Sequence, residues 1–588
     1  MKDFLKYTLA TVLGLVVAGI IFTIIGIVSL AGMLASSDKE TVVKDNSIFV
    51  LDLKGAVTER CTPNPLEQFM GSEYSTCGLD DILSSIRKAK ENDKIKGIYL
   101  NAGMLACSPA SLEEIRNALL DFKTSKKFIV AYGGNYTQGT YYLASVADKV
   151  VVNPSGTIAW HGLAAQSMFL KETLEKLGIE MQIFRVGTYK SAVEPFIATE
   201  MSPANREQTQ AYLNSIWEQM LKDISTSRNI SVDSLNALAD TNMDFQPAEV
   251  YIKNGMADTL MYKDGVLAYL KTLTECEEDD DLNTLSLQDM INVKRNVPKD
   301  KSGNIIAVYY AYGEIDGGGG YSSEEGINSE KVIKDLRKLR EDENVKAVVF
   351  RVNSPGGSAF GSEQIWREIT LLRQEKPVVV SMGDYAASGG YYISCNADWI
   401  VAEPTTLTGS IGIFGMIPNA GKLMNDKLGL HFDVVKTNKL ADIGDLSRPM
   451  NEDEKALVQN MVNQGYELFT KRCAEGRKMA VDSLKMIAEG RVWTGSMAKD
   501  LKLVDQLGGL DDAIDEAVKR AKITEYSLLN YPEKENFLST LLKTKKDGYI
   551  SSSMKENFGD YYNGFTFLKN LKDADRLQAR MPFILSIN

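Results

Sequence analysis

The chain has 588 residues, of which 24% are charged and 44% hydrophobic, a composition typical of a globular protein. This length indicates two or more domains. The formal net charge of −12 and the pI near 5.1 argue against a nucleic-acid partner, because nucleic-acid binding requires a basic face.

Residues 1–36 are predicted to form a short cytoplasmic N-terminus and a transmembrane anchor. No charged residue occurs from Tyr7 to Ala35, and a bilayer core needs about 20 apolar residues. The run is too long for an ordinary cleaved signal segment, so an uncleaved helix is expected. Lys2 and Lys6 precede the run, and the positive-inside rule therefore places the bulk of the chain outside the cytoplasm. We expect a single-pass protein of the inner (cytoplasmic) membrane with its bulk on the periplasmic or extracytoplasmic side.

The six cysteines give no metal-binding pattern. No CxxC pair occurs, so we expect no zinc site and no other metal. Cys61, Cys77 and Cys107 lie close in sequence, and an exported location would permit a disulfide among them. Free buried thiols explain the same residues equally well.

An internal duplication organises the chain beyond the anchor. The segment GTYYLASVADKVVVNPSGTIAWHG aligns with GGYYISCNADWIVAEPTTLTGSIG at an offset of 250 residues. Both copies alternate β-branched runs with helical patterns, which predicts βαβ units and a mostly parallel sheet in each copy. The predicted fold class is therefore α/β, with two tandem repeats after the N-terminal helix.

The predicted boundaries follow from this alignment. The first repeat spans residues 45–285 and the second spans residues 300–530. The acidic segment from Glu275 to Thr284 is either the connector or a solvated loop within one repeat. Residues 531–588 form a C-terminal extension that contains no recognisable motif, so its role stays open.

The string GDYAASGGYYIS predicts a nucleophile turn around Ser388. Small alanines precede this serine, and Gly389 follows it before an apolar helical run. A plain turn with a serine cap explains the same letters. A nucleophilic serine needs a base, but the chain has only two histidines, His161 and His431. Lys190 in GTYKSAVEPF is the next candidate, although a lone lysine is usually a solvated side chain.

The two repeats differ where this chemistry is expected. Gln138 matches Ser388 in the first repeat, and Ala441 matches Lys190 in the second. Each repeat therefore keeps one member of the pair, which favours a single composite site if the repeats pack face to face. Drift at two unrelated surface positions would give the same pattern.

A third motif is NSPGGS, from Asn353 to Ser358, which follows the strand-like run AVVFRV. A rigid Pro-Gly-Gly turn has unhindered backbone N–H groups that can hold the oxyanion of a tetrahedral intermediate. A plain turn is the simpler interpretation of the same letters. The matching stretch of the first repeat, LNAGMLACSP, lacks the Pro-Gly-Gly, so only the repeat with Ser388 keeps this turn.

Four strings together resemble the motifs of the signal peptide peptidase A (protease IV) family, in its long, two-repeat, membrane-anchored form. They are NSPGGS, GDYAASGGYYIS, TLTGSIGIFG and GTYKSAVEPF. The resemblance implies two ClpP/crotonase-like domains. It also implies Ser388 as the nucleophile and Lys190 as the general base. Gly356 and Gly389 would supply the oxyanion N–H groups, with Gly357 as support. The family further implies a homotetramer that degrades cleaved signal peptides and some unfolded proteins.

The predicted mechanism requires a neutral lysine. A free lysine has a pKa of about 10.4, and burial away from carboxylates lowers it. Glu194 is expected to point away from Lys190, since a nearby carboxylate would raise that pKa. Ser410 is a candidate for orienting the amine, although a capping role fits it equally well. If Lys190 were not the base, His161 would be the next residue to test. The reaction needs neither a metal nor an organic cofactor.

Two other classes of function remain open from the sequence. A crotonase-like acyl-CoA enzyme could share the fold and the oxyanion turn, but it needs neither the Ser388–Lys190 pair nor an anchor. A non-catalytic membrane scaffold would not need to keep both residues. The sequence therefore favours a serine endopeptidase that acts on peptides.

Overall fold

The computed structural model describes residues 40–61, 76–296, 300–317, 326–534 and 577–581, together with some positions between 6 and 22. Most of the predicted anchor and most of the C-terminal extension lie outside these residues. Within the described positions, no helix has the length and apolar character needed to cross a membrane. The anchor therefore stays a prediction.

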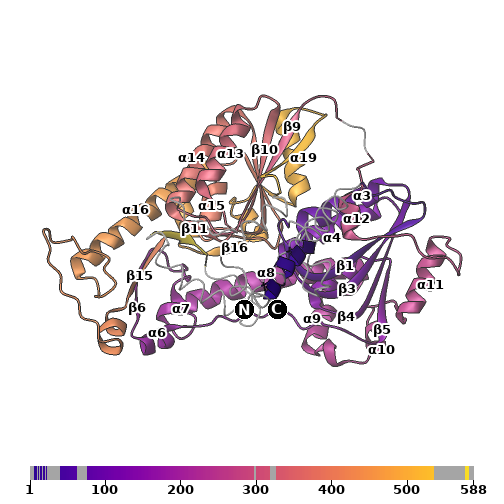
Figure 1. Cartoon of the computed structure of the whole chain (residues 1–588), viewed down its shortest axis with the longest axis horizontal. Helices are drawn as coiled ribbons and strands as arrows, with labels where there is room; N and C mark the ends of the chain where they lie inside the picture. Colours follow the sequence, from indigo (N-terminus) through magenta and orange to yellow (C-terminus); the bar gives the residue numbers. More distant parts are fainter. Residues whose placement is uncertain are drawn as a thin grey trace.

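The first repeat is built on a sheet in which every paired strand is parallel, in the order β2-β1-β3-β4-β5-β7, with β8 beside β1 (Figure 1). Its strands are β1 (Ser47–Thr58), β2 (Thr76–Gly78), β3 (Ile95–Ala106), β4 (Phe128–Tyr136), β5 (Lys149–Ile158), β7 (Thr259–Leu260) and β8 (Thr284–Leu285). Its helices are α3 (Leu79–Glu91), α4 (Pro109–Lys123), α5 (Gln138–Ala144), α6 (Lys171–Leu177), α7 (Glu194–Ile197), α8 (Pro203–Arg228), α9 (Val232–Asp240), η1 (Met243–Phe245), α10 (Ala248–Lys253), α11 (Lys263–Leu273) and α12 (Leu287–Ile291).

The second repeat has a sheet in the order β16-β14-β12-β10-β9-β18, and β13 pairs with both β12 and β17. Its strands are β9 (Ile305–Tyr312), β10 (Val345–Ser354), β12 (Val378–Ala387), β13 (Trp399–Ala402), β14 (Leu407–Gly409), β16 (Val492–Thr494), β17 (Gln506–Leu507) and β18 (Ser527–Tyr531). Its helices are α13 (Ser329–Glu341), α14 (Ala359–Glu375), α15 (Gly389–Ser394), η2 (Leu423–Lys427), α16 (Glu452–Arg477), α17 (Val481–Ile487), α18 (Gly495–Asp500) and α19 (Leu510–Ala521).

The two sheets share one strand order. The run β1-β3-β4-β5 of the first repeat corresponds to β9-β10-β12-β13 of the second, and every pair in both runs is parallel. The prediction of an α/β fold with two mostly parallel sheets is therefore confirmed. The likeness of each repeat to ClpP and crotonase stays a prediction.

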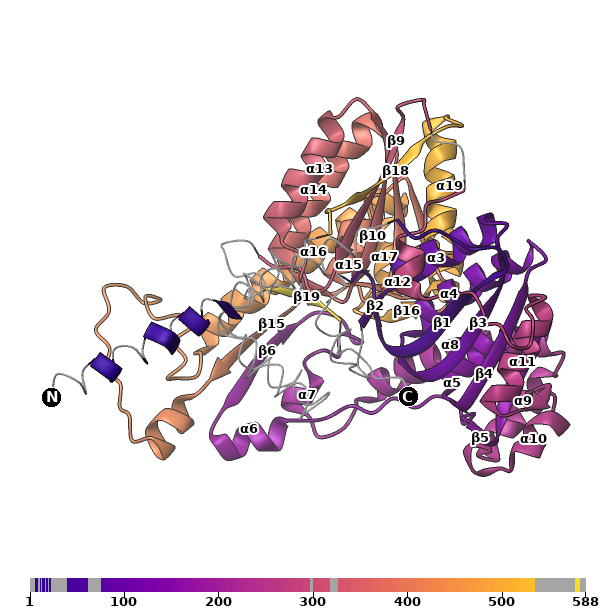
Figure 2. The same cartoon turned by 45° about the vertical axis from the view of Figure 1, so that its right-hand side comes forward.

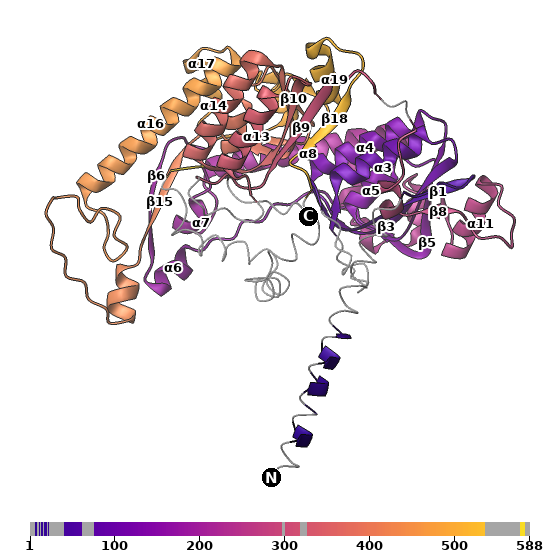
Figure 3. The same cartoon turned by 45° about the horizontal axis from the view of Figure 1, so that its top comes forward.

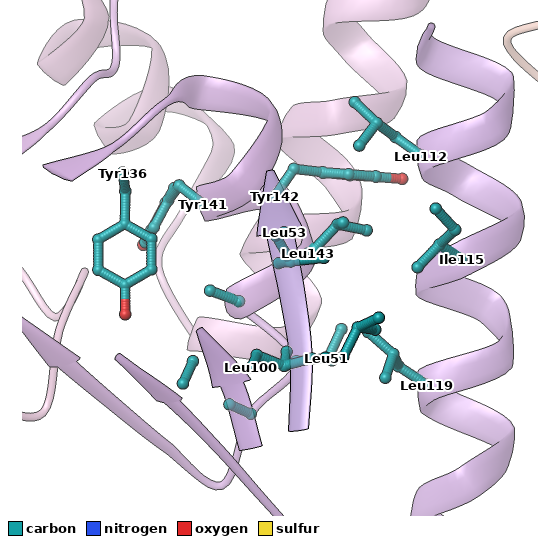
Figure 4. Packing of buried hydrophobic residues seen from close by; sticks show 14 of the residues in the cluster. Leu51, Leu53, Leu100, Leu112, Ile115, Leu119, Tyr136, Tyr141, Tyr142 and Leu143 are labelled. Carbon is teal, nitrogen blue, oxygen red and sulfur yellow. The ribbon is translucent and has the colours of Figure 1, made fainter. Parts of the chain in front are cut away.

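Helix packing in the first repeat shows why these segments fold as they do. The helix α4 places Leu112, Ile115 and Leu119 at helical spacing on one face. That face packs against the sheet strands that carry Leu51 and Leu100 (Figure 4). Strands covered by helices bury apolar side chains, and Leu51, Leu53 and Leu100 of β1 and β3 are almost fully buried.

A third, antiparallel sheet joins the two repeats. Its strand order is β11-β19-β15-β6, with β6 (Glu180–Arg185) from the first repeat and β15 (Phe414–Asn419) from the second (Figure 2). Strand β11 (Gly356–Ser358) lies in the predicted oxyanion turn, and β19 (Gln578–Arg580) comes from the C-terminal extension. Because β6 pairs with β15, the segment that follows β6 in the chain lies against the second repeat.

A buried polar junction also links the repeats. Arg351 is 1% exposed and donates to Glu59 and to Glu114, with shortest distances of 2.6 Å to each. Thr405 donates to Glu113 through its backbone N–H at 3.2 Å and its hydroxyl at 2.7 Å. These carboxylates belong to the first repeat and their donors to the second, so the two sheets are fixed relative to one another.

Candidate active site

Ser388 occupies the sharp turn between β12 and α15. Its backbone has φ 54° and ψ −111°, a conformation that residues with a side chain rarely adopt. The backbone N–H of Ser388 donates to the carbonyl of Gly409 at 2.8 Å, which ties the turn to β14. The sequence places glycines on the helical side of this turn, and a Cβ at Gly390 would lie 2.5 Å from the carbonyl oxygen of Ser354. The turn therefore holds the serine in one strained, fixed position.

The structure brings Lys190 to Ser388, although 198 residues separate them in the chain. Lys190 Nζ lies 2.7 Å from Ser388 Oγ, 3.0 Å from the carbonyl oxygen of Ser410 and 3.1 Å from Ser410 Oγ. A neutral amine has two N–H donors and one lone pair. Its N–H groups can donate to the two Ser410 oxygens, which leaves the lone pair to accept the hydroxyl proton of Ser388.

The surroundings of the lysine favour this neutral form. Burial lowers the pKa of Lys190 well below its usual range, and no carboxylate among the described residues opposes that shift. Glu194 lies four positions further along the chain but points away from the amine. Its carboxylate accepts from Ser202 Oγ at 2.6 Å and from Asn205 Nδ2 at 2.9 Å. Glu194 therefore does not oppose a role for Lys190 as a base.

Two glycines of the second repeat hold the backbone and side chain of Lys190 in place. A Cβ at Gly490 would lie 2.7 Å from Lys190 Cβ and 2.8 Å from its Cα and N. A Cβ at Gly412 would lie 3.2 Å from Lys190 Cδ. Gly490 was not predicted from the sequence, because no local motif around it indicates that a residue of the other repeat packs against its Cα.

The predicted oxyanion glycines lie beside the serine, on β11 and at the start of α15. A Cβ at Gly356 would lie 2.8 Å from the backbone nitrogen of Gly389, so these two backbones are in close contact. The N–H of Gly356 donates to Ser354 Oγ at 3.2 Å, and its carbonyl accepts from Ile315. All three residues of β11 pair with the C-terminal strand, and Gly357 lies opposite Ala579. The N–H of Gly356 is thus already directed to a side chain, which leaves Gly357 and Gly389 as the candidates for oxyanion donors.

The first repeat has no corresponding pair among its described residues. Gln138 begins α5 at the place that Ser388 holds before α15. Its side-chain oxygen accepts from the backbone N–H of His161 at 3.2 Å and of Gly162 at 3.1 Å, and its amide donates back to the carbonyl of Gly162 at 3.1 Å. A bridging amide thus fills this turn, and His161 lies beside it.

The cysteines carry no disulfide. Of Cys61, Cys77 and Cys107, the latter two are free thiols in the structure, and so are Cys276, Cys395 and Cys473. Burial raises the pKa of Cys107 well above its usual range, so this thiol is held in its neutral form. None of the three contributes to the pair described above.

Comparison with known proteins defines first the class and then the family. The chain is 36% identical over 510 residues to "Protease 4" of Salmonella typhi, which covers 84% of this chain and 81% of that protein. It is 34% identical over 485 residues to "Serine protease SPPA, chloroplastic" of Arabidopsis thaliana, covering 82% and 70%. These relatives make the chain a serine protease. This decides against the acyl-CoA enzyme and scaffold alternatives.

The model of Peptidase family S49 matches twice, at residues 121–277 and 370–524, and the chain belongs to that family in its two-repeat form. The two matches agree with the internal duplication predicted from the sequence. A solved structure of a ClpP1 point mutant from Listeria monocytogenes also aligns, with 18% identity and a TM-score of 0.24 over 35% of this chain and 94% of that one. This similarity is too low to carry an argument about the fold.

Proposed function

We propose that the chain is a membrane-anchored endopeptidase that degrades cleaved signal peptides, and some unfolded proteins, with a Ser388–Lys190 dyad. The buried contact of 2.7 Å between Lys190 Nζ and Ser388 Oγ carries this proposal. It combines a hydroxyl in a strained turn with an amine whose pKa is lowered by burial. The lowered pKa leaves the amine neutral near pH 7, and the short distance lets it take the hydroxyl proton.

The reaction follows from these groups. Ser388 Oγ attacks the peptide carbonyl while its proton passes to Lys190 Nζ. The N–H groups of Gly357 and Gly389 stabilise the oxyanion that forms. Lys190 then returns the proton to the leaving amine, which departs and leaves an acyl-enzyme on Ser388. A water molecule, deprotonated by the same amine, hydrolyses that ester and restores the site.

Ser410 has a positioning role in this mechanism. Two of its oxygens accept from the amine, at 3.0 and 3.1 Å, so the lone pair of Lys190 can point only toward Ser388. Its backbone, with φ 49°, is itself held in the left-handed region, which fixes the direction of both oxygens. The oxyanion donor on β11 is assigned to Gly357 because the N–H of Gly356 is directed to Ser354.

Membrane anchoring of the N-terminal segment is part of the proposal. The described positions between 6 and 22 are helical, and Leu13, Leu15 and Phe22 expose 63%, 69% and 74% of their surface. Apolar side chains that face outward on a helix suit a lipid environment better than water. With Lys2 and Lys6 before the span, we place the catalytic bulk on the extracytoplasmic side of the inner membrane.

A homotetramer is also proposed, and a protruding arm of the second repeat supports self-association. The segment after η2 stands away from the body of the molecule (Figure 3). Leu428, Leu430, Phe432 and Val434 alternate along it and are between 44% and 61% exposed. Such a row of apolar side chains is unusual on a monomer and is typical of a surface that another chain covers.

The function is tested with purified protein and a signal-peptide substrate. We expect Ser388→Ala to reduce kcat by at least about a thousandfold, because the nucleophile is lost. Lys190→Arg should be equally inactive, since a guanidinium stays charged and cannot accept the proton. Turnover close to wild type in either variant would refute the dyad. Protease added to intact spheroplasts should digest the bulk of the chain, and full protection would refute the orientation.

A further inference from the structure

Gln208 is a buried polar side chain that takes no part in the chemistry of the dyad. It lies in the second turn of α8 and is 1% exposed. A buried amide destabilises a fold unless its polar atoms find partners. Its nitrogen lies 2.9 Å from Ser191 Oγ and 3.1 Å from the carbonyl oxygen of Tyr189, which are the residues on either side of Lys190. One amide group therefore binds the chain on both sides of the lysine.

The other end of the same amide reaches the second repeat. Gln208 Oε1 accepts from the backbone N–H of Val492, the first residue of β16, at 3.1 Å. A backbone N–H can only donate, so this bond identifies the oxygen end of the amide and turns its nitrogen toward the lysine segment. The nitrogen also lies 3.1 Å from Asn205 Oδ1 on the same helix. A single side chain thus joins the lysine segment of the first repeat to a strand of the second.

Strand β16 is itself bonded to the segments that hold the nucleophile. Val492 lies opposite Gly409 in the antiparallel pair of β16 and β14. The carbonyl of Gly409 accepts from the N–H of Ser388 at 2.8 Å. The residue before β16, Arg491, accepts through its carbonyl from the N–H of Ser410 at 2.7 Å. The strand that the amide reaches is therefore tied both to the turn of Ser388 and to Ser410, which accepts from the lysine amine.

The matching place in the second repeat holds a leucine. The helices α8 and α16 are both 26 residues long, and they begin after the capping residues Ser202 and Asn451. Gln208 is the sixth residue after the first cap, and Leu457, which is 48% exposed, is the sixth after the second. The lysine position of the second repeat is Ala441. Of the two repeats, the one that carries the lysine is therefore also the one that carries the amide.

We propose that Gln208 is a positioning residue of the dyad, whose amide holds the lysine segment on β16 and thereby fixes the distance between Lys190 Nζ and Ser388 Oγ. This inference rests on the proposed function and deepens it. A proton passes between two atoms only within hydrogen-bond reach, so a small displacement of the base lowers the rate of the chemical step. Gln208 bonds to the neighbours of the base, and its loss should therefore act on kcat through the position of Lys190.

The first test replaces Gln208 by methionine, which has a similar length and forms none of these hydrogen bonds. We expect kcat on a signal-peptide substrate to fall about ten- to a hundredfold, because a displacement of about 1 Å can cost a hundredfold in rate. KM should stay within about twofold of the wild-type value, since the substitution removes bonds to the lysine segment only. An unchanged kcat, or a rise in KM that accounts for the whole loss of activity, would overturn the proposal.

A second buried glutamine provides a control for the loss of stability. Gln182, on β6, is 8% exposed, and its Oε1 accepts from the backbone N–H of Met450 at 2.8 Å. This bond also joins the first repeat to the second, but it does not involve a neighbour of Lys190. Gln182→Met should lower the melting temperature to an extent similar to that of Gln208→Met and leave kcat unchanged. Equal kcat in these two variants would show that Gln208 has only a structural role.

A charged variant tests the donors of the amide separately from its acceptor. Gln208→Glu keeps an oxygen for the N–H of Val492, so this buried group stays paired and the chain should fold even if methionine is not tolerated. A carboxyl group lacks the two N–H donors, and kcat should again fall at least about tenfold. Gln210→Glu adds the same group at an exposed position of the same helix and should behave like wild type. Turnover close to wild type in Gln208→Glu would overturn the proposal.

Covalent labelling measures the dyad without a peptide substrate. In the reaction with a small fluorophosphonate, Ser388 Oγ bonds to phosphorus, fluoride leaves and Lys190 takes the hydroxyl proton. The labelling rate of Gln208→Met should fall by about the same factor as its kcat, and an unchanged rate would overturn the proposal.

Failure of this inference can be told apart from failure of the proposed function. If Ser388→Ala and Lys190→Arg are inactive while Gln208→Met matches Gln182→Met, only the positioning role is wrong. If Ser388→Ala and Lys190→Arg are as active as wild type, the dyad itself is wrong.

Discussion

Replacing Gly490 by alanine should move Lys190, and it tests whether the position of this lysine, apart from the stability of the fold, controls kcat. The new Cβ would lie 2.7 to 2.8 Å from the N, Cα and Cβ atoms of Lys190, whereas ordinary contact begins at about 3.4 Å. The lysine backbone must therefore move by roughly 0.6 Å or more. A misplacement of about 1 Å can cost a hundredfold in rate, so we expect kcat to fall about ten- to a hundredfold.

A matched control removes the effect of backbone strain. Gly490 has φ +77° and Gly255 has φ +74°, so alanine at either site costs about 1–2 kcal/mol of conformational strain. A Cβ at Gly255, however, would lie 3.6 Å from the nearest atom of Ile230, an ordinary contact. Gly255→Ala should therefore lower the melting temperature to a similar extent without lowering kcat.

The assay is peptide hydrolysis at several pH values, with melting temperatures measured for both variants. In Gly490→Ala, KM should change little, because the atoms nearest to the new Cβ all belong to Lys190. The pH at which activity rises should also move upward, since a displaced lysine regains contact with water and with it part of its usual pKa. Equal kcat in Gly490→Ala and Gly255→Ala, with an unchanged pH profile, would refute this account of how Lys190 is positioned.

Three further predictions concern buried charge. Lys190→Met should raise the melting temperature at pH 7, because the lysine is protonated below about pH 10.5 in the unfolded chain but neutral in the folded one. This difference destabilises the folded state, and it becomes smaller as the pH approaches 10.5. The increase in melting temperature caused by the substitution should become smaller with it. Arg351→Met should cost about 3–5 kcal/mol in urea unfolding, because Glu59 and Glu114 lose their buried partner. Burial raises the pKa of Glu113 to about 8. The free energy of unfolding should therefore fall by a few kcal/mol as the pH rises from about 4.5 to 8, because the unfolded chain loses this proton first. Glu113→Gln should make that decline less steep. Melting curves without these pH slopes, or normal stability in Arg351→Met, would contradict the corresponding prediction.

Much of the fold was predictable because its signals are local. Central strands such as β5, β10 and β12 contain runs of valine, and the duplication gives a second copy of the same strand order. Ser388 and Lys190 could be chosen because each lies in a distinctive string and because each repeat has lost one of them. Their contact at 2.7 Å agrees with that choice. Local patterns and a repeated sequence therefore pointed to both members of the pair.

Other features depend on contacts that no local pattern records. Glu113 and Glu114 lie on a helix whose sequence looks amphipathic, yet both are buried against the second repeat, where Arg351 and Thr405 bind them. The tail around Ala579 has no alternation that marks it as a strand, and its conformation comes from the two strands that flank it. Such residues acquire their roles only from partners hundreds of positions away.

The division of the dyad between two repeats has a physical consequence. In the proposed mechanism, Lys190 becomes a base only when the second repeat excludes water from it and Ser410 accepts its N–H groups. Before the repeats dock, the same lysine is solvated and protonated, and it cannot take the proton of Ser388. The contacts that join β6 to β15 therefore also convert the lysine to its reactive form. If Lys190 is the base, an incompletely folded chain should be inactive toward its neighbours, because the lysine accepts a proton only after the two repeats have docked.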